Sequence, residues 1–392
     1  MDFRFSDADE RFRQEVLEFI RQELPPDWTG TGLLSEAHSE EEWQFARAMM
    51  RKVGAKNWHS LAWPEEYGGH GSATRQFIFS EEMYYHELPG VDLVGALMCA
   101  PALIQHGTEE QKKEHLPKIA RGEIVWCQGY SEPGAGSDLA ALSTRAVEKD
   151  DCFVLDGQKI WSTNADRADW GYMLARTDPN APKHRGISFF LVDMKTPGIT
   201  ARHLPNIVGT YCEIFLDGVQ VPKKNMIGAK NEGWKVANTV LGFERSGVHR
   251  IAATWRNLDR LVDFAKQTQR DGVPLFRNTV VRSRLADLYV EAQAVRVLAY
   301  RIVWLHSTAR GRDISYEVSV GRLSGALFQQ HVASAAMQML GPYGLLDPGS
   351  RRAPDAGFRR EYLYSLGATV GAGTAEVQRN IIATRGLGLP RG

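Results

Sequence analysis

Three segments of this 392-residue chain combine side chains and backbone that could bind a polar, planar ligand. Residues 130–138 (YSEPGAGSD) form the first segment, directly after a β-prone run. Its glycines let the backbone approach a ligand closely, and Ser131 and Ser137 supply hydroxyl groups. Spacing alone leaves an ordinary surface loop equally acceptable, because glycine-rich loops are common.

The other two segments lie further along the chain. In residues 158–164, Trp161 stands next to hydroxyl-bearing residues, so its indole could pack on a planar cofactor; a tryptophan in the core of a strand is the commoner arrangement. Residues 371–380 form a glycine-rich turn into a helix, with Thr374 as the capping residue. The free N–H groups at such a helix start can bind an anion or a polar ligand, or serve only as a plain cap.

Helical patterns dominate residues 1–120, which precede these segments. Ser6 and Asp9 resemble a capping box, and Phe12 begins a series of apolar residues at helical spacing. Further helical patterns cover residues 40–53, 74–87 and 109–120.

Short β-prone runs replace the helices over residues 121–231. The runs are residues 124–127, 152–155, 186–192 and 214–216. We interpret the Asp-Gly pairs at 156–157 and 217–218 as turns between strands. Strands at this spacing without helices between them favour a small barrel or sandwich over a parallel sheet.

The helical pattern returns over residues 232–392. Apolar residues from Val281 to Ile302 follow one another in steps of four and three, as they do at the seam of a helical bundle. Residues 314–340 are predicted to form a further long helix, ended by Gly341 and Pro342. The predicted fold class is therefore α+β in several parts: a helical domain (1–120), a β-barrel or sandwich domain (121–231) and a helical bundle (232–392).

Composition excludes several other classes of protein. The 47 Lys and Arg balance 47 Asp and Glu, so no basic field would attract nucleic acid or an anionic membrane. Four scattered cysteines without a CxxC pair disfavour a disulfide scaffold or a zinc site, and the histidines lack metal-ligand spacing. We expect no metal, no membrane span and, because no secretory signal is visible, a cytoplasmic location with reduced thiols.

Together, and in this order, the three segments resemble the acyl-CoA dehydrogenase family over nearly the whole chain. The string SEPGAGSD at residues 131–138 is a highly specific signature of that family. Further support comes from residues 63–69, 104–112, 159–164 and 373–379. The resemblance implies a helical N-terminal domain, a middle β domain, a C-terminal four-helix bundle and one FAD per active site.

The resemblance also assigns residues to ligands. It implies that FAD is contacted by Gln128, Tyr130, Ser131, Trp161, Thr163, Gln338, Gly341, Thr374 and Glu376. It implies that the acyl-CoA is contacted by Ser137, Arg245 and Ala372. Pro342 replaces a glycine that is common after Gly341 in the family.

The catalytic base departs from the commonest family pattern. Most members carry a glutamate immediately before the Gly-Thr of the C-terminal loop, where this chain has Ala372, and a methyl group cannot accept a proton. Some members place the base on a helix just before an arginine, a position that Glu244 and Arg245 match here. A helical glutamate is usually a solvated charge, but the loss of the loop carboxylate favours Glu244 as the base. The backbone N–H of Ala372 would still be able to bind the thioester oxygen.

A second departure concerns an arginine of the family pattern. Thr268 falls at its position, and Arg270 is a candidate to replace it.

The resulting functional hypothesis is FAD-dependent α,β-dehydrogenation of an acyl-CoA to a 2-enoyl-CoA, with Glu244 as the base and flavin N5 as the hydride acceptor. One alternative is a non-catalytic or FAD-sharing partner subunit of a heterotetrameric acyl-CoA dehydrogenase, as in bacterial steroid side-chain degradation; residues 183–188 and 386–391 resemble that branch. Another is a flavin monooxygenase or desulfinase of the same fold, because these also lack the C-terminal glutamate.

The resemblance further implies electron-transfer flavoprotein as the electron acceptor and a homotetramer or homodimer, or else a heterotetramer. The acyl chain (straight, branched, cyclic or steroid) stays open, because one methylene changes substrate discrimination by only about 1–3 kcal/mol.

Overall fold

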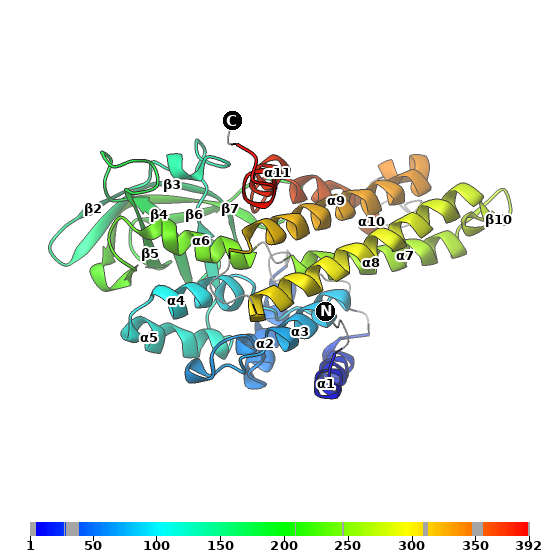
Figure 1. The fold of residues 1–392 in the computed structure, drawn as a ribbon, viewed down its shortest axis with the longest axis horizontal. Coiled ribbons are helices and arrows are strands. Elements are labelled where there is room, and N and C mark those ends of the chain that lie inside the picture. Colours follow the sequence, from blue (N-terminus) through cyan, green and yellow to red (C-terminus); the bar gives the residue numbers. More distant parts are fainter. Residues whose placement is uncertain are drawn as a thin grey trace. The chain divides into compact units, whose positions relative to one another are not determined.

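The computed structural model describes residues 5–26, 28, 39–207, 209–244, 247–308, 313–346 and 356–390. The chain forms two compact units (Figure 1). The sheet unit contains residues 29–72 and 89–244, and the helical unit contains residues 1–28, 73–88 and 245–392. Among the described residues, no helix is both long enough and apolar enough to cross a membrane.

The sheet unit is built on an eight-stranded, mainly antiparallel sheet (Figure 1). Its strands are β1 (Trp126–Gly129), β2 (Arg145–Glu148), β3 (Cys152–Thr163), β4 (Trp170–Arg176), β5 (Ile187–Asp193), β6 (Ile199–His203), β7 (Tyr211–Pro222) and β8 (Met226–Ile227). The order across the sheet is β6-β7-β3-β2-β4-β5-β8, and β1 runs parallel to β4. A β domain in the middle of the chain was predicted, and the structure confirms it.

The two Asp-Gly pairs predicted to be turns lie inside strands, so that prediction was wrong. The register between β3 and β7 shifts between Leu155 and Gly157. Gly157 has φ 152° and Gly218 has φ 62°. The backbone N–H of Gly218 donates to the Asp156 carboxylate on the neighbouring strand at 2.9 Å. Asp-Gly supplies the backbone freedom that a β-bulge needs as well as that of a turn, and both strands therefore continue through it.

The sheet unit also contains helices, which pack with the sheet. They are α2 (Glu40–Ala55), α4 (Ala100–His106), α5 (Glu109–Ala120) and α6 (Gly233–Glu244), with a π-helical turn at Gly95–Cys99 before α4. Ser39 and Thr108 begin α2 and α5 with capping boxes. On α6, Val236, Ala237 and Val240 are buried in the same apolar core as Phe189 of β5. Helix α6 thus packs with the sheet, while the predicted domain limits at residues 120 and 231 stay a prediction.

Several helices of the helical unit pack against its long helix α9. Its helices are α1 (Asp7–Glu23), α3 (Ala73–Tyr85), α7 (Val248–Gln267), α8 (Thr279–Thr308), α9 (Ser315–Leu340), α10 (Ala356–Ala368) and α11 (Ala375–Ile381). Helix α9 contacts α7, α8, α10 and α11 (Figure 1). The predicted seam is confirmed on α8, where every member from Leu285 to Ile302 is buried and only Val281 is half-buried.

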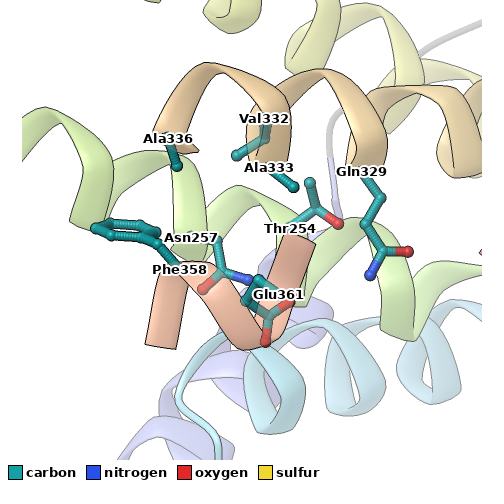
Figure 2. Close-up of a pocket in the computed structure, with 8 residues that line it drawn as sticks. All are labelled: Thr254, Asn257, Gln329, Val332, Ala333, Ala336, Phe358 and Glu361. Atoms are coloured by element: carbon teal, nitrogen blue, oxygen red, sulfur yellow. The ribbon is translucent and has the colours of Figure 1, made fainter. Parts of the chain in front are cut away.

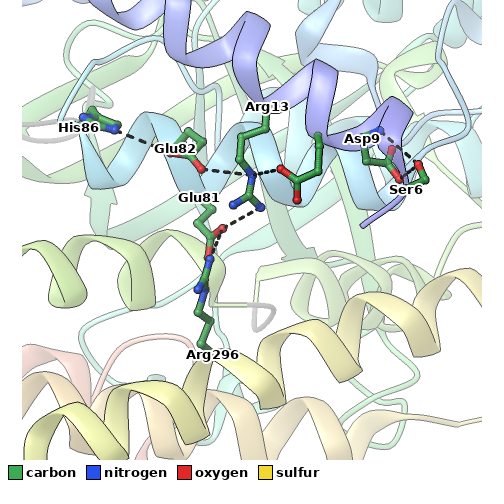
Figure 3. Close-up of polar contacts among 8 residues, drawn as sticks. Ser6, Asp9, Arg13, Glu81, Glu82, His86 and Arg296 are labelled. Carbon is green, nitrogen blue, oxygen red and sulfur yellow. Dashed lines mark hydrogen bonds and ion pairs between the residues drawn. The ribbon is translucent and has the colours of Figure 1, made fainter. Parts of the chain in front are cut away.

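An ion-pair network joins the first helix to the bundle (Figure 3). Arg13 of α1 lies 3.5 Å from both Glu81 and Glu82 of α3. Glu81 in turn accepts two hydrogen bonds from Arg296 of α8, at 2.8 and 3.1 Å. Burial raises the pKa of Glu82, and the Arg13 charge opposes that effect. The network fixes α1 and α3 against α8 within the helical unit.

Candidate active site

The glycine-rich loop after β1 is anchored by the buried carboxylate of Glu132. This carboxylate accepts hydrogen bonds from the backbone N–H groups of Ser143 (2.6 Å) and Thr144 (2.9 Å) and from the Ser143 hydroxyl (2.8 Å). Lys159 of β3, which is fully buried, donates to it at 2.7 Å and also to the Tyr130 carbonyl at 3.3 Å. The loop is therefore tied to β3, the strand that carries the second predicted segment.

Charge and hydrogen bonding keep Glu132 ionised in this buried place. Burial alone would raise its pKa, but the Lys159 ammonium and the surrounding donors outweigh burial and lower the pKa to about 2. Burial also lowers the pKa of Lys159, and the Glu132 carboxylate offsets only part of that effect. Sequence reasoning missed this pair, because nothing in two motifs 27 residues apart shows that their side chains meet.

Three predicted cofactor residues lie at the end of β1 and at the start of the anchored loop. Gln128 is half-buried on β1, and within the described part of the chain its buried Nε2 has no hydrogen-bond partner. Tyr130 is buried, with its ring edge-on to Tyr172 at 5.7 Å. The Ser131 carbonyl accepts a hydrogen bond from the Ile160 N–H at 2.9 Å, while Ser137 at the far end of the loop is exposed.

Trp161 occupies a strained and exposed position on β3. Its φ is 62°, at a bulge where the pairing with β7 shifts between Lys159 and Ser162. Its side chain is 59% exposed, which excludes the alternative of a core tryptophan. Ser162 is turned inward instead, and its buried Oγ has no partner among the described residues; Thr163 is half-buried. A bulky residue at positive φ is uncommon and often marks a functional position.

The C-terminal loop begins the helix that was predicted. The Thr374 hydroxyl accepts a hydrogen bond from the Val377 N–H at 3.2 Å and so caps α11. Ala372 and Gly373 both have positive φ, 56° and 90°. Glu376 is exposed and lies 3.5 Å from Arg379. The unusual features of this loop therefore lie in its backbone more than in its side chains.

The end of α9 carries two further predicted cofactor residues. Gln338 is exposed on its last turn, and Gly341 ends the helix with φ 59°. Arg270, the candidate replacement for the family arginine, donates to the Met339 carbonyl at 3.3 Å. Thr268 is the C-cap residue of α7. Arg270 thus lies beside the Gln338–Gly341 segment, whereas Thr268 only ends a helix.

The predicted base lies at the end of a helix. Glu244 is the last residue of α6. Its side chain, and the whole of Arg245, lie outside the described residues.

A small pocket in the helical unit is lined by none of these residues (Figure 2). It is lined in part by Asn257 of α7, Gln329 of α9 and Phe358 of α10. No predicted site residue lines it, so we do not assign it to the predicted ligands.

Comparison with known proteins identifies the family. Sequence profiles for the acyl-CoA dehydrogenase N-terminal, middle and C-terminal domains match residues 6–123, 127–219 and 231–387. The acyl-CoA dehydrogenase IpdE1 of Mycobacterium tuberculosis is 34% identical over 97% of this chain and 98% of its own length. The chain belongs to the acyl-CoA dehydrogenase family. The acyl-CoA dehydrogenase FadE34 of the same organism is 38% identical over 84% of this chain, which spans only 44% of FadE34.

Solved structures of this family share the fold of the whole chain. A Tcur3481-Tcur3483 steroid ACAD superposes with a TM-score of 0.88 and 32% identity, over 100% of both chains. A chain in the structure of the ChsE4-ChsE5 complex from Mycobacterium tuberculosis superposes with a TM-score of 0.87 and 31% identity, also over 100% of both chains. The predicted architecture of helical, β and helical domains is thereby confirmed.

As a member of this family, the chain is a flavin-dependent acyl-CoA dehydrogenase. The described residues of the sheet unit fit a planar, polar group. Trp161 offers an exposed indole face, and the buried Gln128 Nε2 is a donor without a protein partner in the described chain. The Glu132–Lys159 pair holds the loop that carries Tyr130 and Ser131, which follows Gln128 of β1, next to the strand that carries Trp161.

Proposed function

We propose that this chain uses FAD to dehydrogenate an acyl-CoA thioester to a 2-enoyl-CoA, with Glu244 as the base that removes the α-proton. Membership in the family supports the reaction class. The alanine at position 372 carries the assignment of the base, because the loop that usually supplies a carboxylate has a methyl group here. Glu244 ends a helix immediately before an arginine, which is the alternative position of the base in the family.

The chain's own groups would divide the remaining work. Bound FAD would supply the acceptor for the β-hydrogen. The roles proposed for Trp161 and Thr163 are to flank the flavin ring, and those for Gln128, Tyr130, Ser131, Gln338, Gly341, Thr374 and Glu376 are further cofactor contacts. The roles proposed for Ser137 and Arg245 are contacts to the CoA portion. The N–H of Ala372 would bind the thioester oxygen, where negative charge develops as the α-proton leaves.

Anaerobic flavin bleaching tests this proposal. The protein, loaded with FAD, is mixed with straight, branched, cyclic and steroid acyl-CoAs without oxygen. We expect at least one to bleach the flavin, and Glu244→Gln to abolish bleaching while FAD stays bound. Glu232→Gln is the matched control, because Glu232 is an exposed glutamate just before the start of the same helix and has no proposed role. Fast bleaching in Glu244→Gln would reject Glu244 as the base.

We propose a bulky, steroid-type acyl chain as the substrate class, because a solved structure of this fold at 32% identity is a steroid ACAD. In the bleaching panel, steroid acyl-CoAs should therefore react faster than straight-chain ones. A preference for straight chains would refute the substrate class and leave the reaction class intact.

A partner-dependent subunit is the second candidate, favoured by similarity to a chain of the ChsE4-ChsE5 complex. In that case the chain expressed alone would bind little FAD and would gain it only with a second subunit type. Size-exclusion chromatography together with the FAD-to-protein ratio distinguishes the two candidates. A stable homo-oligomer with one FAD per chain would refute the partner-dependent form.

A further inference from the structure

Two buried side chains hold the backbone of the C-terminal loop through hydrogen bonds to its carbonyl groups. Arg322 of α9 donates through Nη2 to the carbonyls of Ala368 and Gly371, both at 2.6 Å. Gln378 of α11 donates through Nε2 to the carbonyls of Ala372 (3.2 Å) and Gly373 (3.1 Å). Four carbonyls between residues 368 and 373 are therefore bound by these two side chains.

Both side chains that make these contacts are buried. Arg322 is only 3% exposed and Gln378 only 1%. Buried guanidinium and amide groups destabilise a fold unless hydrogen bonds replace their water. Ala368 is the last residue of α10, so its carbonyl has no partner within the helix and the helix end favours a cation there. The two carbonyls therefore hold the Arg322 side chain in place, and Arg322 in turn holds the backbone at these carbonyls.

The N–H groups of the same loop are used differently. Within the described part of the chain, the N–H groups of Ala372 and Gly373 donate to no other group. Both residues have positive φ, and consecutive N–H groups in such turns can form a concave binding site for negative charge. Alanine keeps a left-handed conformation only where its surroundings impose it, and Gln378 binds the carbonyl of that same residue.

We propose that Arg322 and Gln378 are positioning residues that hold the Ala372 N–H in place for the thioester oxygen of the substrate. The inference rests on the proposed dehydrogenation. Neither side chain would touch the substrate. By binding the carbonyls, they fix the peptide planes of the loop, and a fixed donor stabilises developing charge better than a mobile one.

The chain offers a matched control on the same helix as Arg322. Gln330 of α9 donates through Nε2 to the Ser365 carbonyl and to the Thr369 hydroxyl, both at 3.2 Å. It therefore contacts the same end of α10 but none of the four carbonyls. Replacing Gln330 by methionine removes comparable hydrogen bonds without releasing the Ala372 backbone.

The first experiment measures amide hydrogen exchange in the FAD-loaded protein, for the peptide of residues 371–375. Its protected amides are the N–H groups of Gly371 and Ala375, which donate to the Gly367 and Thr369 carbonyls. We expect Gln378→Met to speed exchange there by about tenfold, the factor that corresponds to losing one such hydrogen bond. Gln330→Met should leave that peptide unchanged. Equal exchange in Gln378→Met and wild type, or equal acceleration in both variants, would overturn the inference. Arg322→Met is a second test in which the loop should also loosen.

The second experiment measures the acidity of the α-proton of an acyl-CoA analogue bound to the protein. 3-Thiadodecanoyl-CoA can lose its α-proton but has no β-hydrogen to transfer, so its enolate gives a charge-transfer band with oxidised flavin. In Gln378→Met the band should appear about one pH unit higher than in wild type, a tenfold weaker stabilisation of the enolate. Gln330→Met should match wild type, and an unshifted midpoint in Gln378→Met would overturn the positioning role.

Failure of the proposed function gives a different result. If neither this probe nor any acyl-CoA of the panel alters the flavin spectrum of wild-type protein, dehydrogenation itself is refuted. The exchange experiment then still decides whether Gln378 and Arg322 hold the loop, because it needs no substrate.

Discussion

Replacing Lys159 by methionine is the sharpest test of how the glycine-rich loop is held. Lys159 is fully buried, and methionine keeps most of its apolar volume while removing its charge and its hydrogen bonds. The Glu132 carboxylate would keep its contacts with Ser143 and Thr144 but would lose its only ion-pair partner among the described residues. A buried carboxylate without its counter-charge should destabilise the sheet unit.

The cost of leaving a buried charge unpaired gives the expected magnitude. Removing one partner of a buried ion pair typically costs about 3–5 kcal/mol. We therefore expect Lys159→Met to lower the free energy of unfolding by about 3 kcal/mol.

The pH dependence has a definite sign. The folded pKa of Glu132 is depressed, so its contribution to stability is fully present above its ordinary pKa of 4.5 and is lost as the pH falls through about 2. The stability gap between wild type and Lys159→Met should therefore be widest at neutral pH and narrow in acid. A gap that widened as the pH fell from about 5 to 3 would contradict this cause.

Equilibrium urea unfolding at pH 7 in excess FAD, followed by circular dichroism, measures the loss. The double variant Lys159→Met/Glu132→Gln is the control, because it removes the unpaired charge as well. It should recover at least about 1 kcal/mol relative to Lys159→Met. A loss below about 1 kcal/mol in the single variant, or a double variant less stable than the single one, would refute the reasoning.

Three further changes test other features. Trp161→Ala should change the free energy of unfolding by less than about 0.5 kcal/mol because the side chain is exposed. The same variant should bind FAD about tenfold more weakly in a fluorescence titration. Unchanged FAD affinity would exclude stacking of Trp161 on the flavin. In urea unfolding, Gly157→Ala should lower the free energy of unfolding by about 2 kcal/mol or more, since the new Cβ would lie 2.5 Å from the Thr144 hydroxyl. Gly218→Ala should lower it by only about 1 kcal/mol, because a Cβ at that position meets nothing within 4 Å. Equal losses would contradict this packing. Ala372→Gly should raise stability by about 0.5–1 kcal/mol by relieving its positive φ, and a loss would show that the strain is not there.

Local sequence signals predicted the helices well because each signal acts within one turn. Ser6 caps α1 as its spacing to Asp9 indicated, and Thr374 caps α11. The seam residues of α8 are buried because a helical repeat places them on one face. These features depend on neighbours three or four residues away, and the sequence displays those directly.

The strands were harder to predict because their pairing is not local. Strands β2, β4 and β6 had no strong β-prone run, and they form because neighbouring strands bind their backbone. The Asp-Gly pair at 156–157 looks the same in sequence whether it forms a turn or a bulge, and only pairing with β7 decides. Lys159 likewise gave no sign of its role, since its partner is brought to it by the sheet.

The C-terminal loop shows why a missing carboxylate need not mean a missing function. If residue 372 served only as a base in other members of the family, its loss would leave no physical reason for the strained backbone around it. Yet Ala372 keeps φ 56°, a conformation that costs a non-glycine residue about 1–2 kcal/mol, and Gln378 is buried in order to bind its carbonyl. The loop thus adopts this backbone geometry with a methyl group at position 372. In the proposed mechanism, different groups bind the thioester oxygen and remove the α-proton, so Glu244→Gln should lose the second task while the loop still performs the first.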